Sequence, residues 1–544
     1  MLLDKVFEPF LNEAPICVMA RGVLQRILNP QHIDHLFTQY ARHQYTNELL
    51  FSSLVDLMAR VVLRQEPSVH AAYRKLENQL PVSDQSVYNK LQHVELAVSA
   101  SLVRDSARRI APVIDTLRAS LPSLLPGYRV KFLDGNHLAA TEHRLGELRR
   151  TWAAPLPGLA LVVLDQEHMT VTDVLLTEDG HAQERALLDA VAPLVSAGEV
   201  WVADRNFCTL GFLAALFARR GCFVLRQHGN VQGTLLGQRK SKGRCETGWV
   251  YEQRLRLRGE QGPVMEVRRI TVALDQPTRD GDTEMHVLTN LPAKKVPAVR
   301  VAEVYRKRWT IEGLFFEASA VLSCEIDTLC YPKAALFAFC LGLLACNAVA
   351  LLKAALRAEH GEEVVSQRLS AYYLVLEVRQ TYAGMMVAIP PGHWLVFQGF
   401  DDAQMARVLR LVFYTRFEQY TAPPVAPERG SVATTRRLFS SFSGPKALPQ
   451  LLVATYSTSQ PSLSSTSAPE ALSAWSHACH NCKRQAANIS AKLGASLALY
   501  HGRCRWAWGP YCPDSAYQHT TSVPTNQAIG AARSTANAHQ TCGS

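Results

Sequence analysis

Residues 199–228 read EVWVADRNFCTLGFLAALFARRGCFVLRQH, and this stretch decides the fold class. A short apolar run ends at Asp204, an apolar segment with helical spacing follows at 210–221, and a second apolar run begins at residue 222. Short apolar runs on either side of a helix are typical of buried strands. The stretch therefore predicts a β-α-β unit in which Asp204 stands at the end of a strand.

The residues before this unit predict three more strands and one more helix. YRVKFLD (128–134) reads as a strand that ends at Asp134, and 158–166 and 169–177 read as a hairpin. An amphipathic helix is predicted over 181–198, closed by Gly198. The order β-β-β-α-β-α-β implies that the first and fourth strands are neighbours, so we expect the two strand-end aspartates side by side.

A third carboxylate lies on a long helix predicted over about 298–319. Tyr305, Arg308 and Glu312 have the spacing i, i+3 and i+7, so they share one helical face. Three clustered carboxylates repel one another unless cations neutralise them, and oxygen-only ligands select Mg²⁺ or Mn²⁺. Two such ions about 4 Å apart can activate an attacking hydroxyl in phosphodiester chemistry. A single Asp at a strand end is more often a turn or cap residue, so the prediction depends on the combination.

Together these motifs resemble the DDE transposases of bacterial insertion sequences, and among them the IS-four type, which has a β-strand insertion between the second Asp and the Glu. The resemblance rests on Asp-Gly-Asn at 134–136, Ala-Asp-Arg-Asn-Phe at 203–207 and Tyr-x2-Arg-x3-Glu at 305–312. It covers about residues 125–350. It implies an RNase H-like core and a catalytic, metal-binding triad of Asp134, Asp204 and Glu312. The family signature continues with a Lys seven residues after the Glu, where this chain has Ser319.

Residues 231–295 carry the candidate DNA-contacting insertion. Basic, polar residues at 238–244 alternate with strand-like runs, which predicts a β-rich unit. Such basic residues can follow a DNA backbone, with a solvated loop as the alternative. The resemblance makes Trp249 a candidate for base stacking, with a position in the core of the β unit as the alternative. The candidate DNA-contacting residues are Tyr305, Arg308, Arg205, Trp249, Arg239, Lys240, Lys242 and Arg244.

The sequence pattern divides the chain into five parts. The expected fold class of the whole is α/β. Residues 1–120 are expected to form an all-α N-terminal DNA-binding region, in which 68–95 reads as a helix-turn-helix-like pair or as an ordinary helical hairpin. An RNase H-like core with a mixed five-stranded sheet is expected at 121–230 and 296–425, interrupted by the β-rich insertion at 231–295. Residues 426–544 are rich in Ser, Thr and Ala and are expected to be disordered. That tail holds Cys479, Cys482, Cys504 and Cys512, whose spacing fits common zinc sites poorly.

Composition supports a polyanionic partner. The chain has 544 residues with 57 Lys and Arg against 47 Asp and Glu, a net charge of +10. The 13 scattered cysteines and the lack of a signal-peptide pattern suit a reducing cytoplasm. The charge-free run 334–352 favours a buried core helix over a membrane span.

The resemblance implies a cytoplasmic, nucleoid-associated transposase that acts on double-stranded DNA at element ends and at a target. The reaction implies a homodimer, two Mg²⁺ or Mn²⁺ ions, and neither ATP nor a membrane. Two alternatives remain: an RNase H-fold nuclease without strand transfer, and a catalytically inactive DNA-binding relative.

Overall fold

The computed structural model describes residues 3–44, 48–138, 158–180, 182–258, 264–278, 281–318, 322, 324–326, 331–369 and 371–413. All of these residues belong to one compact unit, Met1–Ala426. The predictions made for Ser319 and for the tail at 426–544, with its cysteines, lie outside the described residues.

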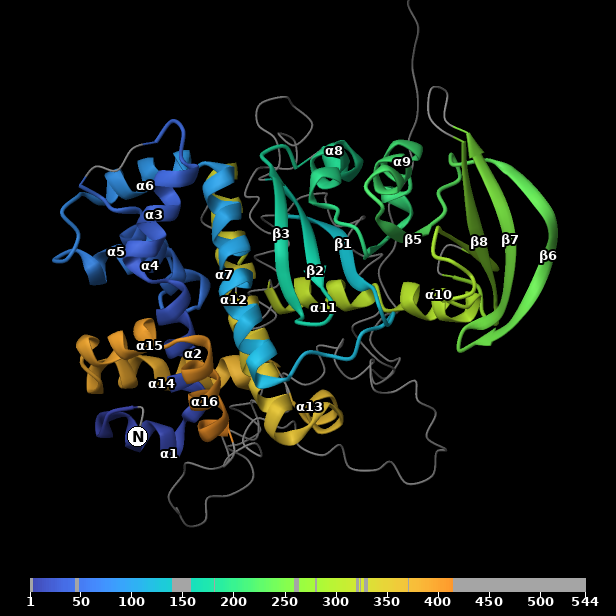
Figure 1. The fold of residues 1–544 in the computed structure, drawn as a ribbon. Helices are drawn as coiled ribbons and strands as arrows, with labels where there is room; N and C mark the ends of the chain where they lie inside the picture. The colour runs from blue at the N-terminus through green and yellow to red at the C-terminus, as the bar shows by residue number, and fades with distance from the viewer. Residues whose placement is uncertain are drawn as a thin grey trace, which may run out of the picture. The chain divides into compact units, whose positions relative to one another are not determined.

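A nine-stranded mixed sheet runs from the middle of this unit to its edge (Figure 1). Its order is β3-β2-β1-β4-β5-β9-β8-β7-β6. β1 pairs in parallel with β4, and β4 with β5, whereas all other neighbours are antiparallel. The strands are β1 (Arg129–His137), β2 (Leu159–Asp165), β3 (Thr170–Thr177), β4 (Glu199–Ala203), β5 (Cys222–Arg226), β6 (Thr234–Cys245), β7 (Gly248–Arg258), β8 (Val264–Leu274) and β9 (Glu284–Thr289). The mixed α/β architecture is confirmed, and the first and fourth strands are neighbours as predicted.

The strands of the β-rich segment continue the same sheet. β9 pairs with β5 on one side and with β8 on the other, so β6 to β9 extend the five strands that precede them. The sequence predicted a small β-rich unit here, because the apolar alternation in 231–295 shows strands but not which neighbour they pair with.

Alternating residues of the central strands enter two different cores, one on each face of the sheet. On β1 and β4, Phe132 and Val202 belong to a large core, while Leu133 and Trp201 belong to a smaller one. The small core includes residues of α8 (Leu188–Val191) and α9 (Leu210–Ala218). The large core includes residues of α10 (Ala298–Arg306), α11 (Trp309–Phe316) and α12 (Pro332–His360). Helices therefore cover both faces of the sheet, which explains why the strands read as continuous apolar runs.

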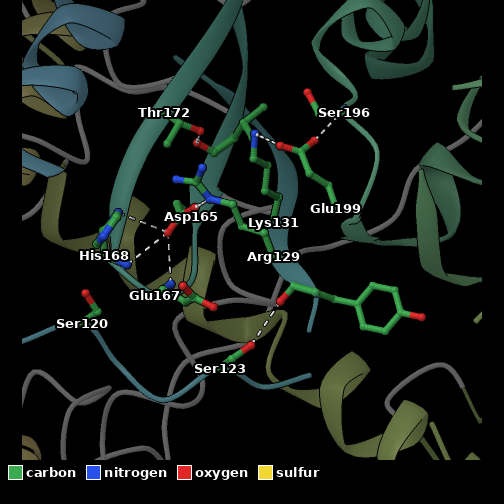
Figure 2. Close-up of polar contacts among 12 residues, drawn as sticks. Ser120, Ser123, Arg129, Lys131, Asp165, Glu167, His168, Thr172, Ser196 and Glu199 are labelled. Carbon is green, nitrogen blue, oxygen red and sulfur yellow. Dashed lines mark hydrogen bonds and ion pairs between the residues drawn. The ribbon is translucent and has the colours of Figure 1, made fainter. Parts of the chain in front are cut away.

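The amino-terminal ends of β1 and β4 are held by two ion pairs, one of them buried and the other between an exposed arginine and a buried aspartate (Figure 2). Lys131 on β1 lies 2.7 Å from Glu199 on β4, and the other oxygen of Glu199 accepts hydrogen bonds from the Ser196 backbone and the Trp201 indole. Arg129 donates to the fully buried Asp165 at the end of β2. These contacts fix the strands at the end of the sheet opposite to Asp134 and Asp204.

The described residues before β1 contain helices and no strand, as the helical spacing predicts. In Figure 1, α7 and α12 lie side by side between the N-terminal helices and β3. The pair at 68–95 is α5 and α6, and Ser68 and Ser83 accept hydrogen bonds from the first turns as N-caps. The helices are α1 (Glu8–Glu13), α2 (Pro15–Ile27), α3 (Pro30–Tyr40), α4 (Phe51–Val62), α5 (Val69–Leu76), α6 (Asp84–His93) and α7 (Leu96–Leu117), followed after α12 by α13 (Glu362–Arg368), α14 (Ala371–Ala388), α15 (Val396–Gly399) and α16 (Asp402–Phe413).

Two predicted helices are shorter than expected. The segment predicted as one helix over 181–198 contains the four-residue α8 between the 3₁₀ turns η4 (Glu184–Leu187) and η5 (Ala192–Leu194). Pro193 lacks the backbone donor that would continue the helix. The helix predicted over 298–319 is divided into α10 and α11, because i to i+3 hydrogen bonds tighten the chain at Arg308 and Ile311.

The apolar run predicted as a core helix is confirmed as one. Within the described residues, α12 is the one helix long and apolar enough to cross a membrane, and its most apolar window is entirely buried in the fold. Its polar residue, Asn347, is fully buried. The Asn347 amide accepts from the Val171 backbone N–H at 2.7 Å and donates to the Val171 carbonyl and to Ser106. Because β3 is an edge strand, this side chain satisfies backbone groups that have no neighbouring strand.

We predict that Asn347→Leu lowers the free energy of unfolding by about 2–4 kcal/mol, because it leaves both Val171 backbone groups buried and unpaired. Ser106→Ala removes a single partner and is expected to cost about 1 kcal/mol. Urea unfolding of both variants checks this. Equal stability of the two variants would show that Asn347 does not serve the edge of β3.

Candidate catalytic site

Asp134 and Asp204 leave neighbouring strands at the same level. The parallel pairing of β1 and β4 ends at Leu133 opposite Ala203, one residue before each aspartate. Asp204 begins the 3₁₀ turn η6 (Arg205–Phe207), whereas β1 continues to His137 along β2. Both side chains therefore stand where the sheet opens between the two strands, as the strand-end positions predict.

The junction of α10 and α11 brings two more residues to this opening. Arg308 donates from Nη1 to Asp134 Oδ2 at 2.7 Å and from Nη2 to Glu312 Oε1 at 2.9 Å. The Tyr305 hydroxyl donates to Asp204 Oδ1 at 3.2 Å. The three predicted carboxylates thus come from three separate elements, and Arg308 and Tyr305 contact all of them. The division of the predicted helix at residue 308 does not prevent this convergence.

Burial makes the charges of this site strongly interdependent. Burial raises the pKa of Asp134 from its ordinary 3.8 to about 6; Arg308 and the Gly135 N–H oppose the rise, and Glu184 and Glu312 add to it. Burial acts to lower the pKa of Arg308, but Asp134 and the other nearby acids outweigh it, so that the Arg308 pKa is raised. The Tyr305 pKa is raised by burial and by Asp204, which keeps the phenol a donor. Arg308 therefore serves as a permanent cation among acids that are only partly exposed to water.

The donor set fits a hard divalent cation by its chemistry. Three carboxylates offer only oxygen, which is the ligand that hard divalent cations prefer. Among the described residues, no three His, Cys, Asp or Glu side chains are already gathered tightly enough to hold a metal ion. The Arg308 guanidinium pairs with both Asp134 and Glu312.

The other candidate DNA-contacting residues lie on the surface. Arg205 is exposed beside Asp204. The basic residues of β6 are exposed, and most pair with acids: Arg239 with Glu284, Lys242 with Glu252 and Arg244 with Asp275, while Lys240 lies on the same strand. The pairs of Arg239 and Arg244 are exposed and contribute at most about 1 kcal/mol each, so a phosphate can replace the acid there.

Trp249 is not the core residue that one interpretation of the sequence favoured. Its side chain is 49% exposed on β7, opposite Arg244 of β6, whose guanidinium lies 5.9 Å from the ring. Arg239 stacks in the same way on Tyr251, at 4.0 Å. The sequence analysis missed Tyr251, although its spacing of two from Trp249 on a strand places both on one face.

Glu184 is a further acid near the site that the sequence analysis missed. Its carboxylate accepts from the Asn206 side chain at 3.3 Å and raises the pKa of Asp134. A regular helix over 181–198 would have carried two acids, Glu184 and Asp189, and nothing in the local pattern singles out Glu184.

Comparison with known proteins identifies the part of the chain that holds the site. Residues 126–347 match the family described as "Transposase DDE domain". Over 125 residues the chain is 31% identical to "Putative transposase y4zB" of Sinorhizobium fredii (strain NBRC 101917 / NGR234), and the alignment covers 22% of this chain and 33% of that relative. The chain thus spans about a third of the length of the curated relative it matches. The family match contains all three carboxylates together with Tyr305 and Arg308.

We predict that Arg308→Gln lowers the free energy of unfolding of the metal-free protein at pH 7.5 by about 3 kcal/mol, because Asp134 loses its buried partner. This loss of unfolding free energy is expected to be smaller at pH 5. The Asp134 pKa is about 6 and rises further without Arg308, so the Asp134 carboxyl is neutral at pH 5 and no longer needs a partner. The matched control is Arg306→Gln, whose exposed pair with Glu246 is expected to matter by less than about 1 kcal/mol. A loss that is the same at both pH values, or equal in the two variants, contradicts this account.

Proposed function

We propose that this chain, whose residues 126–347 match the family described as "Transposase DDE domain", cuts DNA at the ends of its own mobile element and joins those ends to target DNA. The observation that carries the proposal is the meeting of Asp134, Asp204 and Glu312 around Arg308 and Tyr305. The finer expectation of an RNase H-like core is supported by the β3-β2-β1-β4-β5 order, in which two acid-bearing strands lie side by side.

The three carboxylates would hold two divalent ions, Mg²⁺ or Mn²⁺. When bound, such ions activate an attacking hydroxyl and stabilise the leaving oxygen of an in-line displacement. Arg308 reaches toward the carboxylates from the α10–α11 junction, so it is placed to bind a non-bridging oxygen of the phosphate that lies against them. Tyr305 would hold Asp204 in place through its hydroxyl.

The chemistry needs no nucleotide cofactor. In the first step a water oxygen bonds to phosphorus and the P–O3′ bond breaks. The departing 3′ oxygen takes up a proton and becomes a free hydroxyl. In the second step this 3′ hydroxyl attacks a target phosphodiester, one P–O bond forms and one breaks, and a target 3′ oxygen leaves. Because the joining step conserves the number of phosphodiester bonds, ATP is not required.

The remaining partners follow from this reaction. Two element ends must be joined together, so we propose a homodimer that bridges them, acting in the bacterial cytoplasm on nucleoid DNA. The net charge of +10 and the exposed cations of β6 supply attraction to phosphates. The N-terminal helices, with α5 and α6, are the proposed region that recognises the element ends.

We predict that Asp204→Asn reduces Mg²⁺-dependent nicking of a DNA fragment carrying the gene's flanking repeats by more than about a hundredfold, since even outer partners of metal ligands are worth about 10–100-fold. EDTA is expected to abolish nicking by the wild-type protein. Asp189→Asn is the matched control, because Asp189 is an exposed aspartate on α8. Nicking that persists in Asp204→Asn or in EDTA contradicts the proposal.

Joining is tested with a pre-cut end that carries a free 3′ hydroxyl. Covalent transfer of this end into a plasmid supports the transposase. Nicking without transfer supports a nuclease of the same fold, and specific end binding without nicking supports an inactive DNA-binding relative.

A further inference from the structure

The two aspartates lie just beyond the backbone pairing that joins their strands. The parallel ladder between β1 and β4 stops at Leu133 and Ala203, so no backbone hydrogen bond of that ladder fixes Asp134 against Asp204. Tyr305 contacts Asp204 from the α10 side of the sheet. To fix the distance between the two carboxylates, a second contact is needed on the opposite face of the sheet.

Glu184, the first residue of η4, makes that contact. Its Oε2 accepts from Asn206 Nδ2 at 3.3 Å, in the turn that directly follows Asp204. Its other carboxylate oxygen lies against the α-carbon of Gly135, the residue after Asp134. One side chain therefore touches both aspartate-bearing segments.

Gly135 has a spatial reason to be glycine. Its φ is not in the left-handed region, so the backbone there suits any residue. An added Cβ would fall 2.2 Å from Glu184 Oε1 and 2.7 Å from its Cδ. Since these atoms form the far end of a flexible side chain, an alanine at 135 would displace the Glu184 carboxylate while leaving the strand intact.

We propose that Glu184 is a positioning residue that sets the separation of Asp134 and Asp204 and thereby the affinity of the site for divalent cations; this inference rests on the proposed function. It acts from the face of α8 and α9, opposite to Arg308, because the residue after Asp134 on a strand points to the other face. Glu184 acts through its shape and its hydrogen bond to Asn206, since its oxygens already contact Gly135 and Asn206.

Direct Mn²⁺ binding to the full chain, measured by electron paramagnetic resonance, tests this inference. Glu184→Ala and Gly135→Ala are each expected to raise the Mn²⁺ dissociation constant about tenfold, the scale of outer partners of metal ligands. The double variant is expected to match the single variants instead of multiplying them, because both changes remove the same contact. Glu184→Gln keeps the shape and the acceptor and is expected to stay within about twofold of wild type, as is the control Asp189→Asn.

Hydrogen exchange without metal gives a second readout. The amides of Phe207 and Cys208 donate within the turn after Asp204. Their exchange is expected to be faster in Glu184→Ala and Gly135→Ala and unchanged in Glu184→Gln.

Unchanged Mn²⁺ affinity in Glu184→Ala, or a double variant about a hundredfold weaker than wild type, overturns this inference alone. A wild-type protein that binds no Mn²⁺ overturns the proposed function and this inference with it.

Discussion

The guanidinium of Arg308 between Asp134 and Glu312 is the contact on which the rest of the site depends. Without a buried cation, three acids from separate elements would repel one another and stay apart or take up protons. Arg308 reaches this position because the chain tightens where α10 meets α11. The apolar faces of these helices in turn pack on the large core beneath the sheet. The fold can therefore hold these carboxylates near one another, because Arg308 lies between two of them.

The two ends of β1 and β4 have opposite properties. At one end, acids and bases form closed pairs, such as Lys131 with Glu199 and Arg129 with Asp165. At the other end the acids outnumber the bases, and the pairing of β1 with β4 stops one residue before Asp134 and Asp204. Ion pairs whose charges balance hold a strand in place, whereas carboxylates in excess of the bases can bind an added cation. This contrast is why we place the chemistry at the Asp134 end of the sheet and a structural role at the other.

Local sequence patterns predicted the strands, the buried apolar helix and the three carboxylates, because apolar runs and strand-end acids depend on neighbouring residues alone. Contacts between distant segments could not be predicted in this way. Glu184 meets Gly135 only after the segment at 181–198 bends away from a regular helix. Arg239 pairs with Glu284 of β9, and Arg244 pairs with Asp275 after β8, and both acids lie far from β6 along the chain.

We infer that the divalent ions bind together among Asp134, Asp204 and Glu312. Fe²⁺ bound in place of Mg²⁺, with ascorbate and peroxide, generates hydroxyl radicals that cut the polypeptide close to the ion. The account predicts cuts near all three residues in the same sample, suppressed together by excess Mg²⁺ and absent in Asp204→Asn. Cuts confined to another part of the chain, or cuts at these three places that respond differently to Mg²⁺, would contradict it.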